Sequence, residues 1–414
     1  MKKTLIAVAA LSAMAASAMA ANVTIYGVID TGFHFQHSSN SWSASGVSPD
    51  KATPSTNKFD MATGQNSGTR FGLKGDEDLG NGMKVGFILE NGFKSDTGAD
   101  DDSNLAFRRE ANLYVTTNFG TLSLARVGAL SSMTGSYNLA KYAAFGSGWG
   151  DSTAKQSNFW LNNRARMDNT VTYVSPSFAG IKAYAQYSFQ RNGKETEGNE
   201  RKNDRYAGFG LSYDQGAFST ALVVDSVLYN YSSTNRKDSL GVTWGASYDF
   251  GAFKLFGQAQ YGKHENDFGF KNSSVLDAFT AYSTALELKD TDKLAVTKDE
   301  GVKGYGLSLG VTAPVAGGTL LAQVNYLDTE SNGNIEGTTS TQKDTTYYAT
   351  GEAKNWGISA AYTYSLSKRT TAYTYASYTE LKKTWTYKKA KNENYSADNK
   401  QKVTEVGVGI VHKF

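Results

Sequence analysis

The chain has 414 residues, of which 42 are Lys or Arg and 39 are Asp or Glu, so its formal net charge is +3, and it contains no cysteine. A charge this close to balance gives no general sign of a nucleic-acid or acidic partner. The lack of cysteine excludes a disulfide framework and suits passage through an oxidising compartment.

The first twenty residues have the pattern of a cleaved export signal. Two lysines precede an apolar run over residues 5–14, and Ala18-Met19-Ala20 has the small-x-small form of a cleavage site. The run is shorter than the roughly 20 residues that a membrane helix needs. We therefore expect residues 1–20 to be removed and residues 21–414 to form the mature domain, with a net charge of about +1 after the loss of two lysines.

After this signal, apolar and polar residues alternate in segments of about ten residues, which is the period and length of a strand in a membrane barrel. Short and long gaps take turns between the segments, and seven short and eight long gaps predict about sixteen antiparallel strands in one domain. The short gaps are Asp76–Gly82, Thr117–Gly120, Ser175–Gly180, Tyr213–Gly216, Asp249–Ala252, Ala313–Gly318 and Ser365–Lys368, and the long gaps lie near 36–67, 94–105, 127–163, 190–204, 229–238, 262–302, 328–353 and 381–402.

Alternation alone does not separate a membrane barrel from a soluble β-sandwich, because both have one apolar and one polar face. The residues at the ends of the strands distinguish the two folds. Tyrosines recur at the strand ends beside the short gaps, as in the aromatic girdle at a membrane interface. They are Tyr173, Tyr213, Tyr248, Tyr362 and Tyr364.

The last twelve residues, VTEVGVGIVHKF, alternate up to the final Phe414. A terminal strand of this kind can pair with the first strand and close the sheet into a cylinder without an open edge. The first mature stretch, Val23 to Asp30, has the matching pattern. We therefore predict an all-β fold, a transmembrane antiparallel 16-stranded β-barrel.

Four motifs in this order carry a family resemblance: NVTIYGVIDTG, SGTRFGLKGDEDLGNGMKVGFILENGF, SPSFAG followed by IKAYAQYSF, and VGVGIVHKF. They closely resemble the general porins of the outer membrane of betaproteobacterial and neisserial Gram-negative cells. The resemblance runs from Asn22 to Phe414 and is weakest in the long loops. It implies a homotrimer that lets small hydrophilic solutes and ions diffuse passively, without a cofactor, through a pore that the third loop, about 127–163, narrows by folding inward. It also implies that Val406, Val408, Ile410, His412 and Phe414 form the signal read by the barrel-insertion machinery.

The same alternation predicts which charged residues face the lumen. Arg70 alternates with apolar neighbours, and Arg108 shares its face with Glu110. Arg166 likewise shares its face with Asp168. The resemblance favours the three arginines, because the basic cluster of such porins follows the first three long loops. The predicted pore-lining and constriction residues are Arg70, Lys74, Lys84, Arg108, Glu110, Asp151, Arg166 and Asp168.

The third loop contains one acid, Asp151, against Lys141 and Lys155, whereas porin constrictions usually set an acidic inner loop against a basic wall. We therefore expect a mild anion preference, since arginine rings concentrate anions in a narrow pore. The alternative is that the arginines pair with nearby acids and only hold the wall together. Arg109 has the parity of the lipid-facing side and is expected above the bilayer.

Two alternative functions stay open. The first is a channel with one preferred solute, a sugar or organic anion, for which the possible stacking surfaces are Trp160, Tyr373, Tyr375 and Tyr378. The second is an added adhesin role for the loops near 262–302 and 328–353. The lysines within 382–391 could meet lipopolysaccharide phosphates in the outer-membrane lipid, or simply keep the surface soluble.

Other motifs carry little chemistry. Residues 306–310 match the G-x-S-x-G form of a hydrolase elbow, but the strand pattern continues through Ser308, which we expect in the lumen wall. The four histidines lack metal-ligand spacing. The acidic run at 96–102 could bind calcium or contact a neighbouring subunit, and we expect a solvated loop there. We predict neither a catalytic site nor a metal site.

Overall fold

A computed structural model of the chain describes residues 23–44, 47–101, 105–146, 149, 159–161, 164–195, 203–230, 237–265, 294–298, 300–331, 335–339, 347–389 and 393–414. The predicted signal peptide and Asp151 lie outside these described residues.

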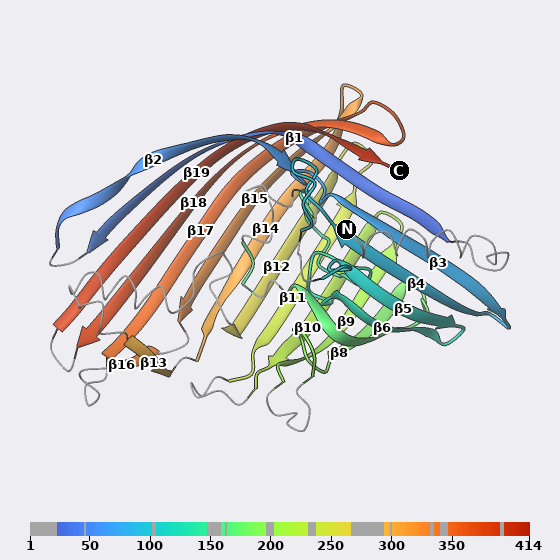
Figure 1. Cartoon of the computed structure of the whole chain (residues 1–414), viewed down its shortest axis with the longest axis horizontal. Coiled ribbons are helices and arrows are strands. Elements are labelled where there is room, and N and C mark those ends of the chain that lie inside the picture. Colours follow the sequence, from blue (N-terminus) through green and yellow to red (C-terminus); the bar gives the residue numbers. More distant parts are fainter. Residues whose placement is uncertain are drawn as a thin grey trace.

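The strands form a closed ring. Among the described residues, nineteen strands belong to one sheet. β1 (Thr24–Ala44) pairs with β3 (Arg70–Gly80) over its first residues and with β19 (Glu393–Lys413) over most of its length, so the wall has no open edge. Figure 1 shows β1 and β19 side by side, in blue and red. Three of the nineteen strands lie outside the ring, which confirms the predicted closed antiparallel barrel of sixteen strands.

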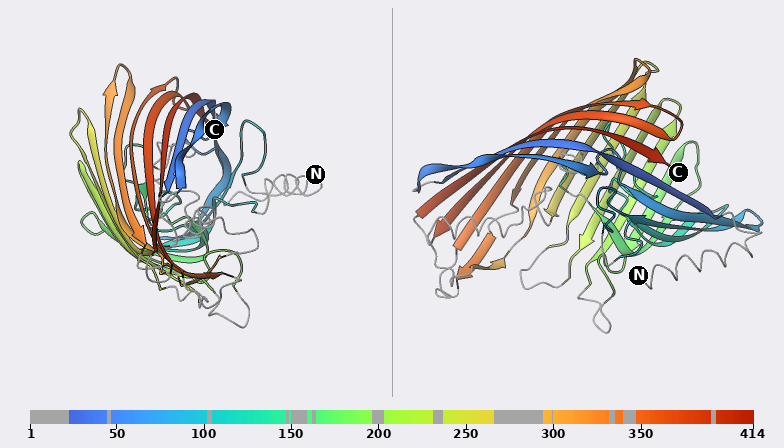
Figure 2. Two further views of the ribbon diagram at one scale, coloured as in Figure 1. Left: turned by 90° about the vertical axis from the view of Figure 1, so that its left-hand side faces the viewer. Right: turned by 45° about the horizontal axis from the view of Figure 1, so that its top comes forward.

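The other wall strands follow in chain order, each antiparallel to the next: β4 (Met83–Gly92), β5 (Glu110–Thr117), β6 (Gly120–Gly128), β7 (Arg166–Val174), β8 (Ile181–Ser188), β9 (Arg205–Gln215), β10 (Phe218–Leu228), β11 (Leu240–Asp249), β12 (Lys254–Glu265), β14 (Val302–Val315), β15 (Gly318–Ser331), β17 (Tyr347–Ser365) and β18 (Thr370–Lys389). The curved wall that these strands make is visible from two further directions in Figure 2.

The wall is uneven in height. β5 has 8 residues, whereas β17, β18 and β19 have 19, 20 and 21 residues, about twice the predicted length. The outer halves of the long strands occupy sequence that predicts loops. β2 (Val47–Thr63) pairs with the outer half of β1, and β13 (Leu294–Lys298) pairs with β16 (Ile335–Thr339), also within predicted loops.

Most wall strands have an apolar outer face and a largely polar inner face. On β19, Val406, Val408 and Ile410 are each about half exposed, whereas Glu405, directly before them, is completely buried. An apolar face repeated around a closed wall is the outer surface of a membrane barrel, and it exceeds what a soluble monomer exposes. Within the described part of the chain, no helix is long and apolar enough to cross a membrane.

The seam between the last and first strands is tightly closed. Phe414 and Gly27 exchange two backbone hydrogen bonds, with N···O distances of 3.0 Å from the Gly27 amide and 3.1 Å from the Phe414 amide. The Phe414 ring lies directly over Gly27, where any Cβ would collide with it. Glycine at this position therefore lets the final aromatic side chain lie across the first strand.

Aromatic side chains surround the rim at the short turns. The hydroxyl of Tyr173 donates to the carbonyl oxygen of Phe119 in a neighbouring turn at 2.6 Å, and the hydroxyl of Tyr362 donates to that of Val315 at 3.0 Å. The Phe119 side chain is 83% exposed. Tyrosines that bond to turn carbonyls while apolar rings point outward are typical of a membrane interface.

Candidate channel constriction

The segment between β6 and β7 packs against the inner side of the wall. Three inward-facing glycines on β9, β11 and β14 leave room for side chains of this segment, because an added Cβ would collide with them. The pairs are Gly210 with Leu139, Gly245 with Tyr142 (2.6 Å from the added Cβ) and Gly310 with Ala144 (2.8 Å). Burial raises the pKa of the Tyr142 hydroxyl to about 12, so this side chain adds no negative charge to the lumen at neutral pH.

The same segment extends across the interior to the strands on the far side. The Phe145 amide donates to the Gln323 side-chain carbonyl on β15 at 3.0 Å. Trp149 packs edge-on against Tyr373 and Tyr375 of β18, with ring centroids 5.6 and 5.3 Å apart. The segment thus covers inner wall from β9 to β18.

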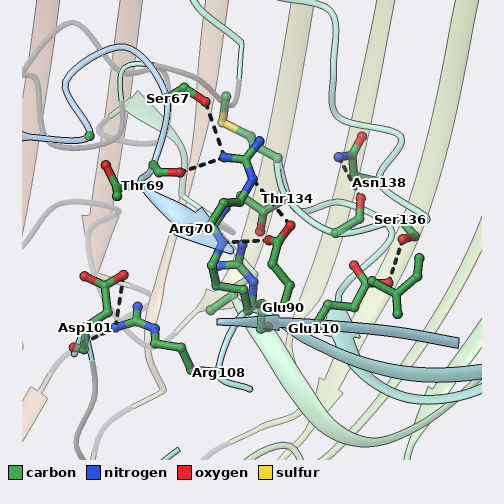
Figure 3. Close-up of a pocket in the computed structure, with 18 of the residues that line it drawn as sticks. Ser67, Thr69, Arg70, Glu90, Asp101, Arg108, Glu110, Thr134, Ser136 and Asn138 are labelled. Atoms are coloured by element: carbon green, nitrogen blue, oxygen red, sulfur yellow. Dashed lines mark hydrogen bonds and ion pairs between the residues drawn. The ribbon is translucent and has the colours of Figure 1, made fainter. Parts of the chain in front are cut away.

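A charged cavity of about 900 Å³ lies beside the opposite wall (Figure 3). We call it the arginine cavity. Its lining contains seven basic and three acidic side chains, drawn from β3, β4 and the residues at or near the starts of β5 and β7. The charged residues are Arg70, Lys74, Glu90, Lys94, Asp101, Arg108, Arg109, Glu110, Arg164 and Arg166.

Glu90 neutralises part of this positive charge. One carboxylate oxygen lies 2.7 Å from Arg109 Nε, and the other lies 3.3 Å from Arg70 Nε. The Tyr26 hydroxyl also donates to this carboxylate at 3.1 Å. Figure 3 shows Glu90 next to Arg70, and Asp101 next to Arg108, whose Nη1 lies 3.8 Å from the Asp101 carboxylate.

Arg164 is held in a buried carboxylate clamp. Its two terminal nitrogens donate to the two oxygens of Glu265 on β12 at 2.6 and 2.8 Å, and Asp225 on β10 lies 3.6 Å away. This bidentate geometry fixes the guanidinium and compensates its charge. Arg164 and Glu265 therefore fasten the end of the β6–β7 segment to the wall.

Three cations in the cavity form no ion pair with a carboxylate of the described residues: Arg166, Lys74 and Lys94. The Arg166 Nε is buried without a hydrogen-bond partner. Lys74 Nζ lies 5.3 Å from the centre of the Tyr26 ring. Uncompensated cations in a wet cavity attract mobile anions.

Of the three acids in the cavity lining, Glu90 and Asp101 form ion pairs with arginines, whereas Glu110 makes a hydrogen bond to the β6–β7 segment. Its Oε1 accepts a hydrogen bond from Ser136 of that segment at 2.6 Å and one from Asn112 at 3.0 Å. The residue is 5% exposed. Glu110 therefore joins the barrel wall to the segment that narrows the interior.

Five of the predicted constriction residues line the arginine cavity together, and two lie elsewhere. Arg70, Lys74, Arg108, Glu110 and Arg166 are in the lining. Lys84 lies beside a short turn, 3.9 Å from the Asp76 carboxylate. Asp168 forms an ion pair with Arg126.

The strand register shifts next to Asp168, which is not in the lining of the cavity. Asn169 has a left-handed backbone (φ 50°), and the pairing of β6 with β7 skips a position between Ala125 and Val127. Such an irregularity reverses the alternation on one side of it. Parity counted from the regular part of β7 therefore fails at Asp168.

The parity of Arg109 does not describe its position. The alternation assigned it to the lipid-facing side, but it lines the cavity and pairs with Glu90. Arg109 precedes the start of β5, so strand parity does not apply to it. Sequence reasoning missed Arg164, although its Arg-x-Arg spacing with Arg166 was a usable signal.

Three of the four side chains that suggested a stacking surface are buried, and Tyr378 is partly exposed. Trp160, Tyr373 and Tyr375 are at most 3% exposed. Ser308 lies within a regular strand, opposite Gln258 and Asn325, and not at a strand-to-helix turn. Among the described residues, no cluster of three His, Cys, Asp or Glu side chains could hold a metal ion.

Comparisons with known proteins agree with this architecture. A family model described as Gram-negative porin matches residues 7–384. An outer membrane porin protein of Bordetella pertussis is 31% identical over the whole of both chains, and outer membrane porin protein 32 of Delftia acidovorans is 31% identical over 75% of this chain and 84% of its own. The fold is similar to that of the anion-selective porin from Comamonas acidovorans, with a TM-score of 0.60 at 24% identity, covering 95% of this chain and all of that one.

Proposed function

Since this chain belongs to the Gram-negative porin family, and is therefore an outer-membrane channel for passive diffusion of small hydrophilic solutes, we propose that its arginine cavity gives the channel a weak preference for anions. The observation that carries this proposal is the excess of positive charge in the cavity, where Arg166, Lys74 and Lys94 form no ion pair with a carboxylate of the described residues. The anion-selective porin with a similar fold supports the same sign of selectivity.

The mechanism is diffusion through a narrowed, charged passage. The β6–β7 segment excludes large solutes by occupying one side of the lumen. Anions that pass on the other side meet seven basic and three acidic side chains. In aqueous salt each charge acts over about 8–10 Å, so selectivity is set mainly in this narrow part.

We extend the proposal to the assembled state, which the same family membership supports. The channel works as a homotrimer, and the low wall formed by short strands such as β5 is the natural place for subunits to meet. Exposed Val406, Val408 and Ile410, together with His412 and Phe414, act as the signal for the barrel-insertion machinery. Residues 1–20 are the cleaved export signal.

The zero-current potential of the purified protein in a planar bilayer tests the selectivity. With a tenfold KCl gradient, the expected potential has the sign of chloride preference and stays well below the ideal chloride value. A potential of the opposite sign would overturn the proposed anion preference. Liposome swelling with graded neutral sugars separates a general channel, limited by solute size, from one that saturates with a preferred sugar.

A further inference from the structure

Residues 64–69 connect β2 to β3, and four of them line the arginine cavity. Their sequence, GQNSGT, has the Gly, Asn and Ser residues that favour an irregular turn. The Nη1 of Arg70 donates to Ser67 Oγ at 3.3 Å and to the Gly68 carbonyl oxygen at 2.7 Å (Figure 3). Glu90 lies 3.3 Å from Nε of the same side chain. The 64–69 turn therefore holds the end of the guanidinium at Nη1, beyond the Nε contact with Glu90.

A completely buried carboxylate on β1 fixes the path of this turn. Asp30 is 0% exposed, and its Oδ2 accepts hydrogen bonds from the backbone amides of Asn66 at 2.7 Å and Ser67 at 2.6 Å. The Asp30 carbonyl oxygen accepts another from the Gly64 amide at 3.1 Å. Hydrogen bonds from backbone amides to an ionised carboxylate are stronger than those between neutral groups. The backbone of the turn is thus anchored to β1 at its beginning and at its middle.

Asp30 does not line the arginine cavity itself. We propose that Asp30 is a positioning residue of the channel: it fixes the 64–69 turn, and the turn holds the Arg70 guanidinium where it acts on passing anions. This inference rests on the proposed anion preference and extends it to a residue outside the cavity lining. A purely structural role for Asp30 would act instead through its other oxygen, Oδ1, which accepts a hydrogen bond from the Tyr373 hydroxyl of β18 at 2.7 Å.

The test measures the chloride-to-potassium permeability ratio of the purified channel from its zero-current potential in a planar bilayer. Asp30→Ala removes both acceptor oxygens of the side chain, so the turn loses this anchor and Arg70 is no longer held in place. Moving a unit charge a few ångströms away from the passage is expected to lower the ratio about twofold. In an Arg70→Gln background the same substitution should cause no fall, because the side chain that it displaces is absent. A fall of equal size in both backgrounds would overturn the proposal.

Two further variants separate position from charge and from the contact with β18. Asp30→Asn is as neutral as Asp30→Ala, but its oxygen can accept from the two turn amides while its amino group faces the Tyr373 hydroxyl, which can accept. We expect a ratio close to that of wild type for Asp30→Asn and for Tyr373→Phe. An equal rise of the ratio in Asp30→Ala and Asp30→Asn would show that only the charge acts, and a fall in Tyr373→Phe as large as that in Asp30→Ala would show a structural role. Either result would overturn the proposal.

Folding of each variant is checked by heat-modifiable gel mobility. If Asp30→Ala does not fold, Ser67→Ala takes its place in the same comparison, since it removes one of the two acceptors of Arg70 and leaves the buried carboxylate intact. Its expected fall is smaller, and it should also be absent in the Arg70→Gln background; a fall that persists there would overturn the proposal. A wild-type channel without anion preference would contradict the proposed function, whereas the dependence on Arg70 is a difference between variants and is tested separately.

Discussion

Replacing Arg166 by glutamine should lower the anion preference of the channel by an amount that the structure sets. No carboxylate among the described residues forms an ion pair with Arg166, and Glu90 and Glu110 act on it only at longer range, so its charge can act on a passing ion. At about 6 Å in water, a unit charge contributes about 0.7 kcal/mol. At 0.1 M salt, with a Debye length of about 10 Å, about 0.4 kcal/mol remains. This is a factor of about two for each ion, in opposite directions for chloride and potassium, and so a factor of about four in the chloride-to-potassium permeability ratio.

The assay is the zero-current potential of single-residue variants in KCl gradients at low and high salt. Lys84→Gln is the matched control, because Lys84 has the same charge but is 54% exposed beside Asp76 near a short turn. Glu90→Gln should change the ratio in the opposite direction, since it frees Arg70 and Arg109 from their shared carboxylate. At 1 M salt the Debye length falls to about 3 Å, and the difference between wild type and Arg166→Gln should nearly vanish. Equal effects of the Arg166 and Lys84 variants would refute the placement of the selectivity in the arginine cavity.

Three more substitutions test the packing of the β6–β7 segment on the inner wall, the Arg164–Glu265 ion pair, and the contact between the last and first strands. Gly245→Val should displace the Tyr142 side chain and give larger or noisier single-channel currents. Gly257→Val is the control, because an added Cβ there meets nothing within 4 Å. Identical currents from the two variants would contradict the packing of the inner segment on Gly245. Arg164→Gln leaves Glu265 buried without its cation and should cost about 3–5 kcal/mol of stability in urea titrations. Adding Glu265→Gln in a double variant should restore part of this loss. An Arg164→Gln variant as stable as wild type would argue against the ion pair as a stabilising contact. Phe414→Ala should reduce the folded fraction seen by heat-modifiable gel mobility, and an unchanged fraction would remove the assembly role.

Alternation predicted the wall well because lipid outside and water inside act on every second residue. Val406, Val408 and Ile410 all point outward as their parity requires. Beyond the lipid, both faces of a strand are wet, and the alternation disappears. For that reason the outer half of β1 and the whole of β2, over Ser38 to Thr63, resemble a polar loop in sequence although they form strands.

Strand parity is a sound guide to the constriction where its residues belong to regular strands. Arg70 and Lys74 follow from the parity of β3. Arg109 precedes a strand, and Asp168 adjoins a register shift, so the positions of both depend on backbone irregularities that composition does not encode. The clamp on Arg164 joins residues 101 positions apart, and only the closed barrel brings them together.

The assignment of wall residues to a water-facing inner side and a lipid-facing outer side can be tested directly by introducing single cysteines, because the chain has no cysteine of its own. Lys74→Cys and Val408→Cys are each exposed, in a planar bilayer, to a negatively charged, water-soluble thiol reagent while current is recorded. Modification at position 74 should reduce chloride current, and position 408 should not react. Rapid modification at position 408 with none at position 74 would contradict a water-filled lumen on the arginine side of the wall.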